Sequence, residues 1–305
     1  MENIISPLTK NSEAVFERRI KTKQLISDYN KSFNIDVSDY FTNLDYISIY
    51  KCINTGYRFY YPYNLSGDSK FYEHFQKFDW YYMPWKWEHE ISKNYINDGD
   101  KLLEVGCGQG AFLKKINELY SLDKSIGLEL NESSKNDYGK FQVLNERIED
   151  YSVNNKDSFD VVCSYQVLEH IADVNSFIAS KIACLKPKGK MIISVPNNDS
   201  YLKNDDFNLN MPPHHMGLWT ENSLKNLCNI FPLKLIKVHL EELQEYHIHT
   251  YLGSEYNLKY KNKLIQSIVR KFHVLVGVYS KKAEKIKSNR LNIIGHTILL
   301  VYEKQ

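Results

Sequence analysis

The residues best suited to chemistry lie in a glycine-rich turn. Residues 102–116 read LLEVGCGQGAFLKKI, in which a short apolar strand runs into Gly106, Gly108 and Gly110 and then into a helix. Glycines let the backbone approach a ligand closely, and the amides at the start of the helix point at that ligand. The acid Glu129 follows about 20 residues later, where a ribose-binding carboxylate is expected. The turn therefore predicts a site for a nucleotide-type cofactor.

The surrounding motifs bear on which cofactor binds. GCGQGA satisfies the GxGxxA form of the dinucleotide fingerprint, so NAD and S-adenosylmethionine (SAM) both fit the turn alone. The longer order ExGxGxG, GLELN, FDVVCSYQVLEHI and LKPKGKMIISVPN across residues 100–200 resembles the class I SAM-dependent methyltransferases. More loosely, GYRFYYP, SGDSKFYEHF and WYYMPWKWEHE look like methyltransferases found among bacterial surface-polysaccharide enzymes.

The resemblance implies SAM as the cofactor and a role for each part of its site. Glu104 and the turn, Cys107 included, would meet the methionine part of SAM, while Glu129 with the adjacent Leu130 would hold the ribose hydroxyls. Arg147 and Ile148 would flank the adenine of SAM. The reactive sulfonium would be bordered by Ser164, Tyr165 and Gln166.

Three histidines are candidates for the catalytic base. Methyl transfer to a hydroxyl needs an unprotonated oxygen held in line, so a nearby base is expected. His170 follows the fourth predicted strand, and His214 with His215 follows the fifth, at the sheet edge where ligands bind in such folds. His170 could equally orient its loop by hydrogen bonding.

A metal site is not predicted. Glu169 and His170 are similar to the ExxEH pattern of the ubiquinone-biosynthesis O-methyltransferases, which can bind a divalent cation. Gln166 replaces the first carboxylate of that pattern, and hard cations prefer charged oxygen ligands. The five cysteines are scattered without a CxxC pair, which gives no indication of a zinc site or of a disulfide framework.

Aromatic residues before the turn predict a lid or an acceptor site. Tyr82 and Trp85 belong to an aromatic stretch interrupted by charged residues, and Trp219 lies in the loop that carries the histidine pair. We expect these three rings to shape the acceptor site, with core packing as the alternative.

Hydrophobic periodicity predicts the elements that position these residues. Short apolar strands alternate with helices, expected at 110–120, 131–138 and 173–185, which favours an α/β fold with a doubly wound, Rossmann-like methyltransferase sheet. An antiparallel last strand is expected at the C-terminus. Residues 12–30 predict a helix and 44–63 a hairpin, so residues 1–95 form an N-terminal helical and aromatic extension and 96–305 the SAM-binding domain.

A basic segment interrupts the domain before its last strand. Residues 259–290 carry ten lysines and arginines against one acid, Glu284, with apolar positions at helical spacing. This pattern predicts a basic amphipathic helix. The helix either covers the core with a solvated basic face or contacts an anionic membrane surface or a lipid-linked substrate.

Composition narrows the classes of protein. The chain has 305 residues, 43% of them hydrophobic, and a formal net charge of +2, which excludes disorder as its main state and a global nucleic-acid surface. The first residues lack the order of a signal peptide, which predicts a cytoplasmic protein.

These observations together predict a SAM-dependent methyltransferase. The motif resemblance favours O-methylation of a sugar hydroxyl in a glycan, or in a nucleotide-linked or lipid-linked intermediate. Methylation of a quinone-type phenol or a small amine, and a non-catalytic SAM-binding scaffold, are the alternatives. An NAD-dependent oxidoreductase is a more remote one.

Overall fold

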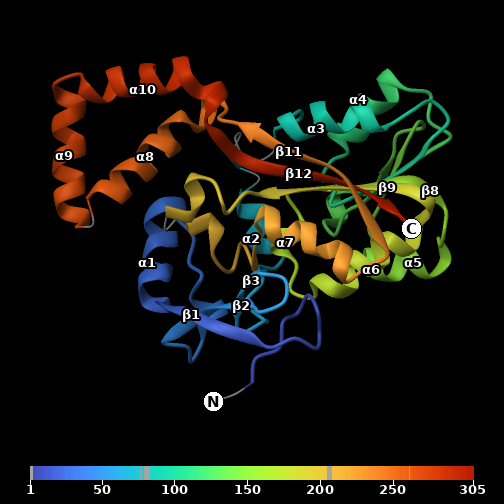
Figure 1. Cartoon of the computed structure of the whole chain (residues 1–305), viewed down its shortest axis with the longest axis horizontal. Helices are drawn as coiled ribbons and strands as arrows, with labels where there is room; N and C mark the ends of the chain where they lie inside the picture. Colours follow the sequence, from blue (N-terminus) through green and yellow to red (C-terminus); the bar gives the residue numbers. More distant parts are fainter. Residues whose placement is uncertain (1–2, 76, 79–82, 205–207, 261) are drawn as a thin grey trace.

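A large mixed sheet forms the centre of the computed structural model, which describes residues 3–75, 77–78, 83–204, 208–260 and 262–305. Within these residues eight strands pair in the order β11-β12-β9-β8-β4-β5-β7-β6 (Figure 1). The pairs from β9 to β7 are parallel, whereas β12 runs antiparallel to β9, as predicted for the last strand. The strands are β4 (Lys101–Val105), β5 (Lys124–Leu128), β6 (Asn136–Asp137), β7 (Gln142–Leu144), β8 (Phe159–Tyr165), β9 (Leu185–Pro196), β11 (Leu233–Glu242) and β12 (Ile294–Lys304).

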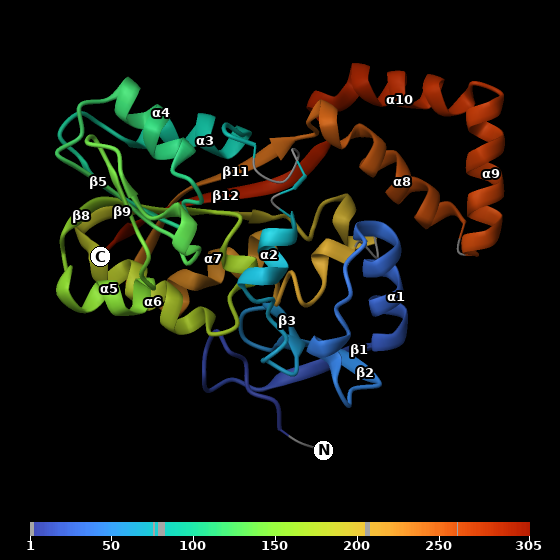
Figure 2. The same cartoon turned by 180° about the vertical axis from the view of Figure 1, so that it is seen from behind.

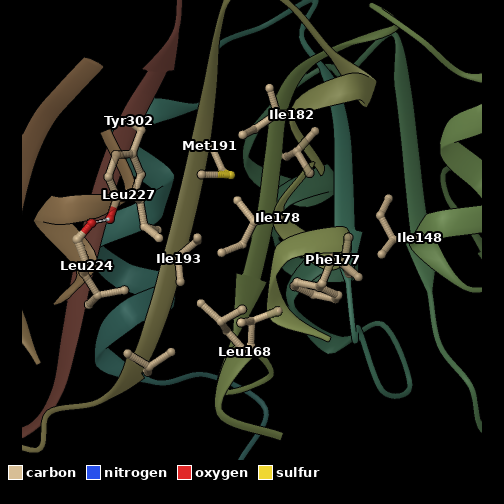
Figure 3. Packing of buried hydrophobic residues seen from close by; sticks show 14 of the residues in the cluster. Ile148, Leu168, Phe177, Ile178, Ile182, Met191, Ile193, Leu224, Leu227 and Tyr302 are labelled. Atoms are coloured by element: carbon tan, nitrogen blue, oxygen red, sulfur yellow. Dashed lines mark hydrogen bonds between the residues drawn. The ribbon is translucent and has the colours of Figure 1, made fainter. Parts of the chain in front are cut away.

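Helices cover both faces of this sheet because its strands alternate two sets of buried side chains. In β9, Met191 and Ile193 face one core cluster and Ile192 faces the other. The first cluster is closed by α5 (Ile148–Asn154), α6 (Val174–Cys184) and α7 (Glu221–Lys225), the second by α3 (Trp87–Ser92) and α4 (Ala111–Leu119). Figure 3 shows Ile178 of α6 beside Met191 and Ile193 of β9, with Phe177 farther across the same face toward Ile148 of α5. The predicted α/β fold class is confirmed.

A second, smaller sheet lies beside the first. It has the order β1-β2-β3-β10, formed by β1 (Ala14–Lys21), β2 (Tyr46–Cys52), β3 (Arg58–Tyr61) and β10 (Gly217–Leu218). With α1 (Thr22–Phe33) and α2 (Ser69–Phe75) it encloses its own core cluster. The predicted hairpin at 44–63 is present as β2 and β3. Because β10 comes from beyond residue 96, the N-terminal module is completed by a later segment of chain.

Two predicted helices are wrong. The expected helix at 12–30 begins with strand β1, because the backbone of Ala14–Lys21 pairs with β2, and only then continues as α1. The expected helix at 131–138 is a single 3-10 turn at Glu132–Ser134 followed by β6. There Asp137 accepts a hydrogen bond from the backbone N–H of Gly139, a local bond that competes with helix formation.

The basic insertion is three helices rather than one. They are α8 (Ile248–Lys259), α9 (Lys263–Leu275) and α10 (Val278–Asn289). Gly277 has a φ of +72°, a left-handed conformation that ends α9 and turns the chain into α10. The three helices extend beyond the end of the sheet, with α9 outermost (Figures 1 and 2). None of the helices in the described part of the chain has the length and apolarity needed to cross a bilayer.

Candidate functional site

The glycine turn closes tightly between β4 and α4. Gly106, Gly108 and Gly110 have φ values of 76°, 54° and 74°, which side-chain-bearing residues rarely adopt. A Cβ on Gly106 would lie 2.4 Å from a methyl carbon of Val167, and one on Gly110 would lie 2.6 Å from the ring of Phe141. The turn therefore needs glycine both for its conformation and for space. Its contact with Val167 brings it against the segment that leads to His170.

Glu129 organises the same turn from the end of β5. Its Oε2 accepts a hydrogen bond from the backbone N–H of Gly108 at 2.9 Å, and its Oε1 accepts from the N–H groups of Leu130 at 2.8 Å and Asn131 at 3.1 Å. The carboxylate is thus held where the sequence places the ribose-binding acid. Neighbouring Leu130 is exposed, whereas Cys107 inside the turn is buried.

Glu104 and Tyr165 provide unpaired polar atoms next to the turn. Glu104 is buried at the end of β4, and its Oε2 has no hydrogen-bond partner among the described residues. Burial, followed by repulsion from Glu129, raises the pKa of Glu104 well above its usual value. The Tyr165 hydroxyl is also buried, and within the described part of the chain it lacks a geometrically sound hydrogen bond. A cofactor carrying an ammonium group would pair with the Glu104 carboxylate, so these residues fit SAM.

The other predicted cofactor residues differ in their exposure to solvent. Arg147 is exposed before α5, where it pairs with Glu149, and Ile148 is buried in the first core cluster. Ser164 is fully buried, and its hydroxyl accepts a hydrogen bond of 2.6 Å from Lys181 of α6. Gln166 has a left-handed backbone, with φ of 54°, at the carboxyl end of β8. Their roles stay predictions.

The three predicted histidines come together; we call His170, His214 and His215 the histidine cluster. The His170 ring centroid lies 4.7 Å from that of His214 and 4.8 Å from that of His215, and the latter two rings stack at 4.5 Å. Burial lowers the pKa of His170 to about 4 and those of the other two well below their usual value. All three imidazoles are therefore uncharged at neutral pH.

The two predicted aromatic residues that the structure describes, Trp85 and Trp219, lie in different surroundings. Tyr82 lies outside the described residues. Trp85 stacks on Phe112 of α4 at 6.0 Å and donates a hydrogen bond from its Nε1 to Glu90. Trp219 is fully buried in the first core cluster and packs on Tyr57 at 4.2 Å. Trp219 thus supports the loop of the histidine pair from within the core, and its predicted contact with the acceptor stays a prediction.

Sequence reasoning named Gln166 but missed three buried polar residues near it, Glu88, Glu241 and Thr297; we call these four residues the polar cluster. The Gln166 amide lies 3.3 Å from Glu88 and 3.5 Å from Thr297, and Glu241 accepts a hydrogen bond from the Thr297 N–H at 2.8 Å. One oxygen of Glu241 has no partner in the described chain. Burial raises the pKa of Glu241 to about 8. These residues come from four separate elements, so no local motif connects them.

Comparison with known proteins identifies the domain. The family model described as a methyltransferase domain matches residues 80–238, slightly more than half of the chain. The chain belongs to the methyltransferase domain family. A chain from the complex between the Haloferax volcanii Trm112 methyltransferase activator and a methyltransferase shares the fold, with a TM-score of 0.50, 13% identity and coverage of 77% of this chain and 94% of that one.

Further similar proteins name the cofactor and a reaction. A SAM-dependent methyltransferase from Archaeoglobus fulgidus is 20% identical, with a TM-score of 0.49, over 78% of this chain and all of that one. The mitochondrial ubiquinone biosynthesis O-methyltransferase of Dictyostelium discoideum is 30% identical over 131 residues, 35% of this chain and 40% of the relative. The ubiquinone biosynthesis O-methyltransferase of Vibrio campbellii is 31% identical over 112 residues, which cover 34% of this chain and 48% of the relative.

These comparisons confirm part of the sequence analysis. The family match confirms the predicted SAM-dependent methyltransferase domain with its cofactor SAM. The chain spans less than half the length of these two curated relatives. Both relatives are named as O-methyltransferases of ubiquinone biosynthesis, and neither name mentions a sugar acceptor.

Proposed function

We propose that this chain transfers the methyl group of SAM to the hydroxyl oxygen of a phenol-type acceptor. The observation that carries the proposal is the convergence of three uncharged imidazoles, one of which, His170, lies just beyond the carboxyl end of β8 on the segment that touches the cofactor turn through Val167. Ligands in open α/β sheets bind at this edge.

The reaction balances with the groups present. The acceptor oxygen attacks the methyl carbon of SAM, the carbon–sulfur bond breaks, and its electron pair leaves with the sulfur of S-adenosylhomocysteine (SAH). The acceptor proton passes to an imidazole. The Nδ1 of His170 lies 2.6 Å from the carbonyl oxygen of His214 and donates to it. That bond leaves the lone pair on Nε2, which is then the atom that accepts the proton.

The basicity of the cluster favours a phenol over an alcohol. Burial lowers the pKa of His170 to about 4, which makes its imidazole a weak base. A phenol, with a pKa near 10 as in tyrosine, ionises far more readily than a sugar hydroxyl. A weak base therefore suits a phenol better, and the names of the similar ubiquinone biosynthesis enzymes agree with that choice.

A sugar hydroxyl is the second candidate, and the polar cluster favours it. Buried Glu88 and Glu241, with half-buried Gln166, offer hydrogen-bonding atoms, and one oxygen of Glu241 has no partner in the described chain. Such a set could bind several hydroxyl groups at once, because buried polar atoms need partners.

An acceptor assay separates the two candidates. The purified full chain is incubated with methyl-labelled SAM and either simple catechols and phenols or nucleotide-linked sugars, and SAH and labelled product are quantified. We expect label in the phenols and none in the sugars. Transfer to sugars alone would overturn the phenol proposal in favour of the second candidate. SAH binding without methyl transfer to either class of acceptor would contradict O-methylation. Methyl transfer to small amines in place of phenols would contradict it as well.

A further inference from the structure

We propose that the histidine cluster binds a divalent transition-metal ion. One ring nitrogen from each of His170, His214 and His215 lies within 4.8 Å of the other two. Glu169 and His170 alone lack the first carboxylate of the ExxEH pattern, and for that reason the sequence predicts no metal site. The fold adds two nitrogen donors from a loop 44 residues later in the chain.

Hydrogen bonds orient all three rings in the same way. The Nδ1 atoms of His170, His214 and His215 lie 2.6 Å from the His214 carbonyl, 2.7 Å from the Leu209 carbonyl and 3.1 Å from the Asn210 side-chain oxygen. Each acceptor is an oxygen, so each Nδ1 carries the proton and each Nε2 carries a lone pair. Histidines that bind metals typically donate their other ring nitrogen to such acceptors.

The donor set indicates which ion would bind. Three neutral imidazoles suit Zn²⁺, Co²⁺ or Ni²⁺ better than Mg²⁺ or Ca²⁺. Tetrahedral Zn²⁺ with Zn–N bonds of about 2.0–2.1 Å would place the nitrogens roughly 3.3 Å apart, so the rings would close by less than about 2 Å.

A carboxylate stands next to the three rings. Glu169 Oε1 lies 4.0 Å from His170 Nε2, and Glu169 is buried with its Oε2 lacking a partner in the described residues. Buried polar atoms without partners call for one, and a cation supplies it. The three nitrogens leave one position of a tetrahedral ion for the acceptor oxygen, whose proton a bound cation would make easier to lose. With the ion bound, this activation would replace direct proton transfer to Nε2 of His170, because that lone pair is then a ligand. That catalytic role rests on the proposed function, but binding of the ion does not.

Cobalt titration tests the site directly. The full chain is stripped with a chelator and titrated with Co²⁺, whose visible absorption reports tetrahedral nitrogen ligation. We expect one equivalent per chain, and a loss of affinity of at least roughly 100-fold in His215→Asn and in His170→Asn. Asparagine can still donate from the Nδ position, which preserves the local hydrogen bond. His249→Asn, on the exposed surface of α8, is the matched control and should bind Co²⁺ normally.

SAH titration of every variant by calorimetry separates loss of the ion from loss of the fold. Absence of Co²⁺ binding by the wild-type chain, or equal binding by wild type and both cluster variants, would overturn the metal site. Full methyl transfer by the metal-free chain would remove the ion from catalysis and leave the proposed function standing. Absence of transfer by the Co²⁺- or Zn²⁺-loaded chain would contradict the proposed function and not the metal site.

A different observation carries a second proposal: we propose that α9 docks on an anionic membrane surface. The helix packs mainly against its neighbours α8 and α10, and none of its described residues is buried. Most of its exposed apolar side chains fall on one face at helical spacing, with Val274 off that face: Leu264, Ile265, Ile268, Phe272 and Leu275, followed by Val276 at the C-cap. Leu264 is 72% exposed and Leu275 is 84% exposed, values unusual for leucine on a surface without a partner.

Charge identifies the occupant of this face. Lys263 and Lys271 lie on α9 itself, and Lys281, Lys282 and Lys285 follow on α10, with Glu284 the only acid there. Interface cores between proteins are depleted in lysine, whereas a helix with an apolar face and flanking lysines matches an anionic lipid surface. Each lysine near such a surface adds to its electrostatic attraction for the protein.

Vesicle sedimentation tests the docking. The full chain is spun with phosphatidylcholine vesicles that contain or lack 30% phosphatidylglycerol, a content on the order of that used to mimic an anionic leaflet. We expect binding only to the anionic vesicles, weakened at least roughly 10-fold by Ile268→Asp combined with Leu275→Asp. Val153→Asp replaces an equally exposed apolar residue on α5 and should bind as wild type. Equal binding by the double variant, or a dimer in light scattering that the double variant abolishes, would overturn the proposal.

Discussion

Replacing His170 with asparagine is expected to lower the turnover number for methyl transfer by roughly 10²–10⁴-fold, the range for loss of a general base or of an equivalent activating group. His170 is the most accessible member of the histidine cluster, with its side chain 18% exposed. Asparagine can keep the hydrogen bond to the His214 carbonyl but offers no lone pair at the Nε2 position. The measurement is single-turnover kinetics with methyl-labelled SAM and the acceptor found in the screen.

Two further readouts qualify this expectation. Affinity for SAH should be unchanged, because His170 lies beyond the cofactor turn, and His249→Asn should turn over normally. Because burial lowers the pKa of His170 to about 4, the imidazole stays uncharged through neutral pH. Wild-type turnover should therefore show no loss from protonation of His170 until the pH falls to about 5 or below. An unchanged turnover in His170→Asn would exclude a catalytic role for this residue.

Replacing Glu129 with alanine is expected to weaken SAH binding by roughly 100-fold. The carboxylate accepts hydrogen bonds from the N–H groups of Gly108, Leu130 and Asn131, and it stands where the ribose hydroxyls are predicted. Hydrogen bonds to charged groups each contribute about 1.5–3 kcal/mol, so losing one or two to the ribose accounts for that factor. Distortion of the glycine turn would add to it. Isothermal titration calorimetry gives the affinity directly.

A neighbouring acid provides the matched control for this variant. Glu132 is exposed in the 3-10 turn that follows Glu129, and Glu132→Ala should bind SAH as the wild type does. NADH should produce no heat with any variant. Retention of full SAH affinity in Glu129→Ala would show that the ribose is held by other residues.

The cofactor half of the site was predictable because its signals are local. Gly106 and Gly110 are required by backbone angles and by the closeness of Val167 and Phe141, and such requirements appear in the sequence as glycines at fixed spacing. The alternation of strands and helices predicted the sheet for the same reason, since each strand buries side chains on both faces. The helix expected at 12–30 failed because pairing with β2 overrides the helical spacing of a few apolar residues.

The acceptor half depended on the tertiary structure. The sequence by itself determined a SAM-binding methyltransferase sheet, the position of Glu129 at its cofactor turn and a basic amphipathic segment before the last strand. Only the fold brought His170 against His214 and His215, and Glu88 against Glu241, because these residues lie on segments separated by tens of residues and meet through packing of the loops. Long-range packing leaves no periodicity in the chain, so the histidine cluster and the exposed face of α9 emerge only when the elements are placed in space.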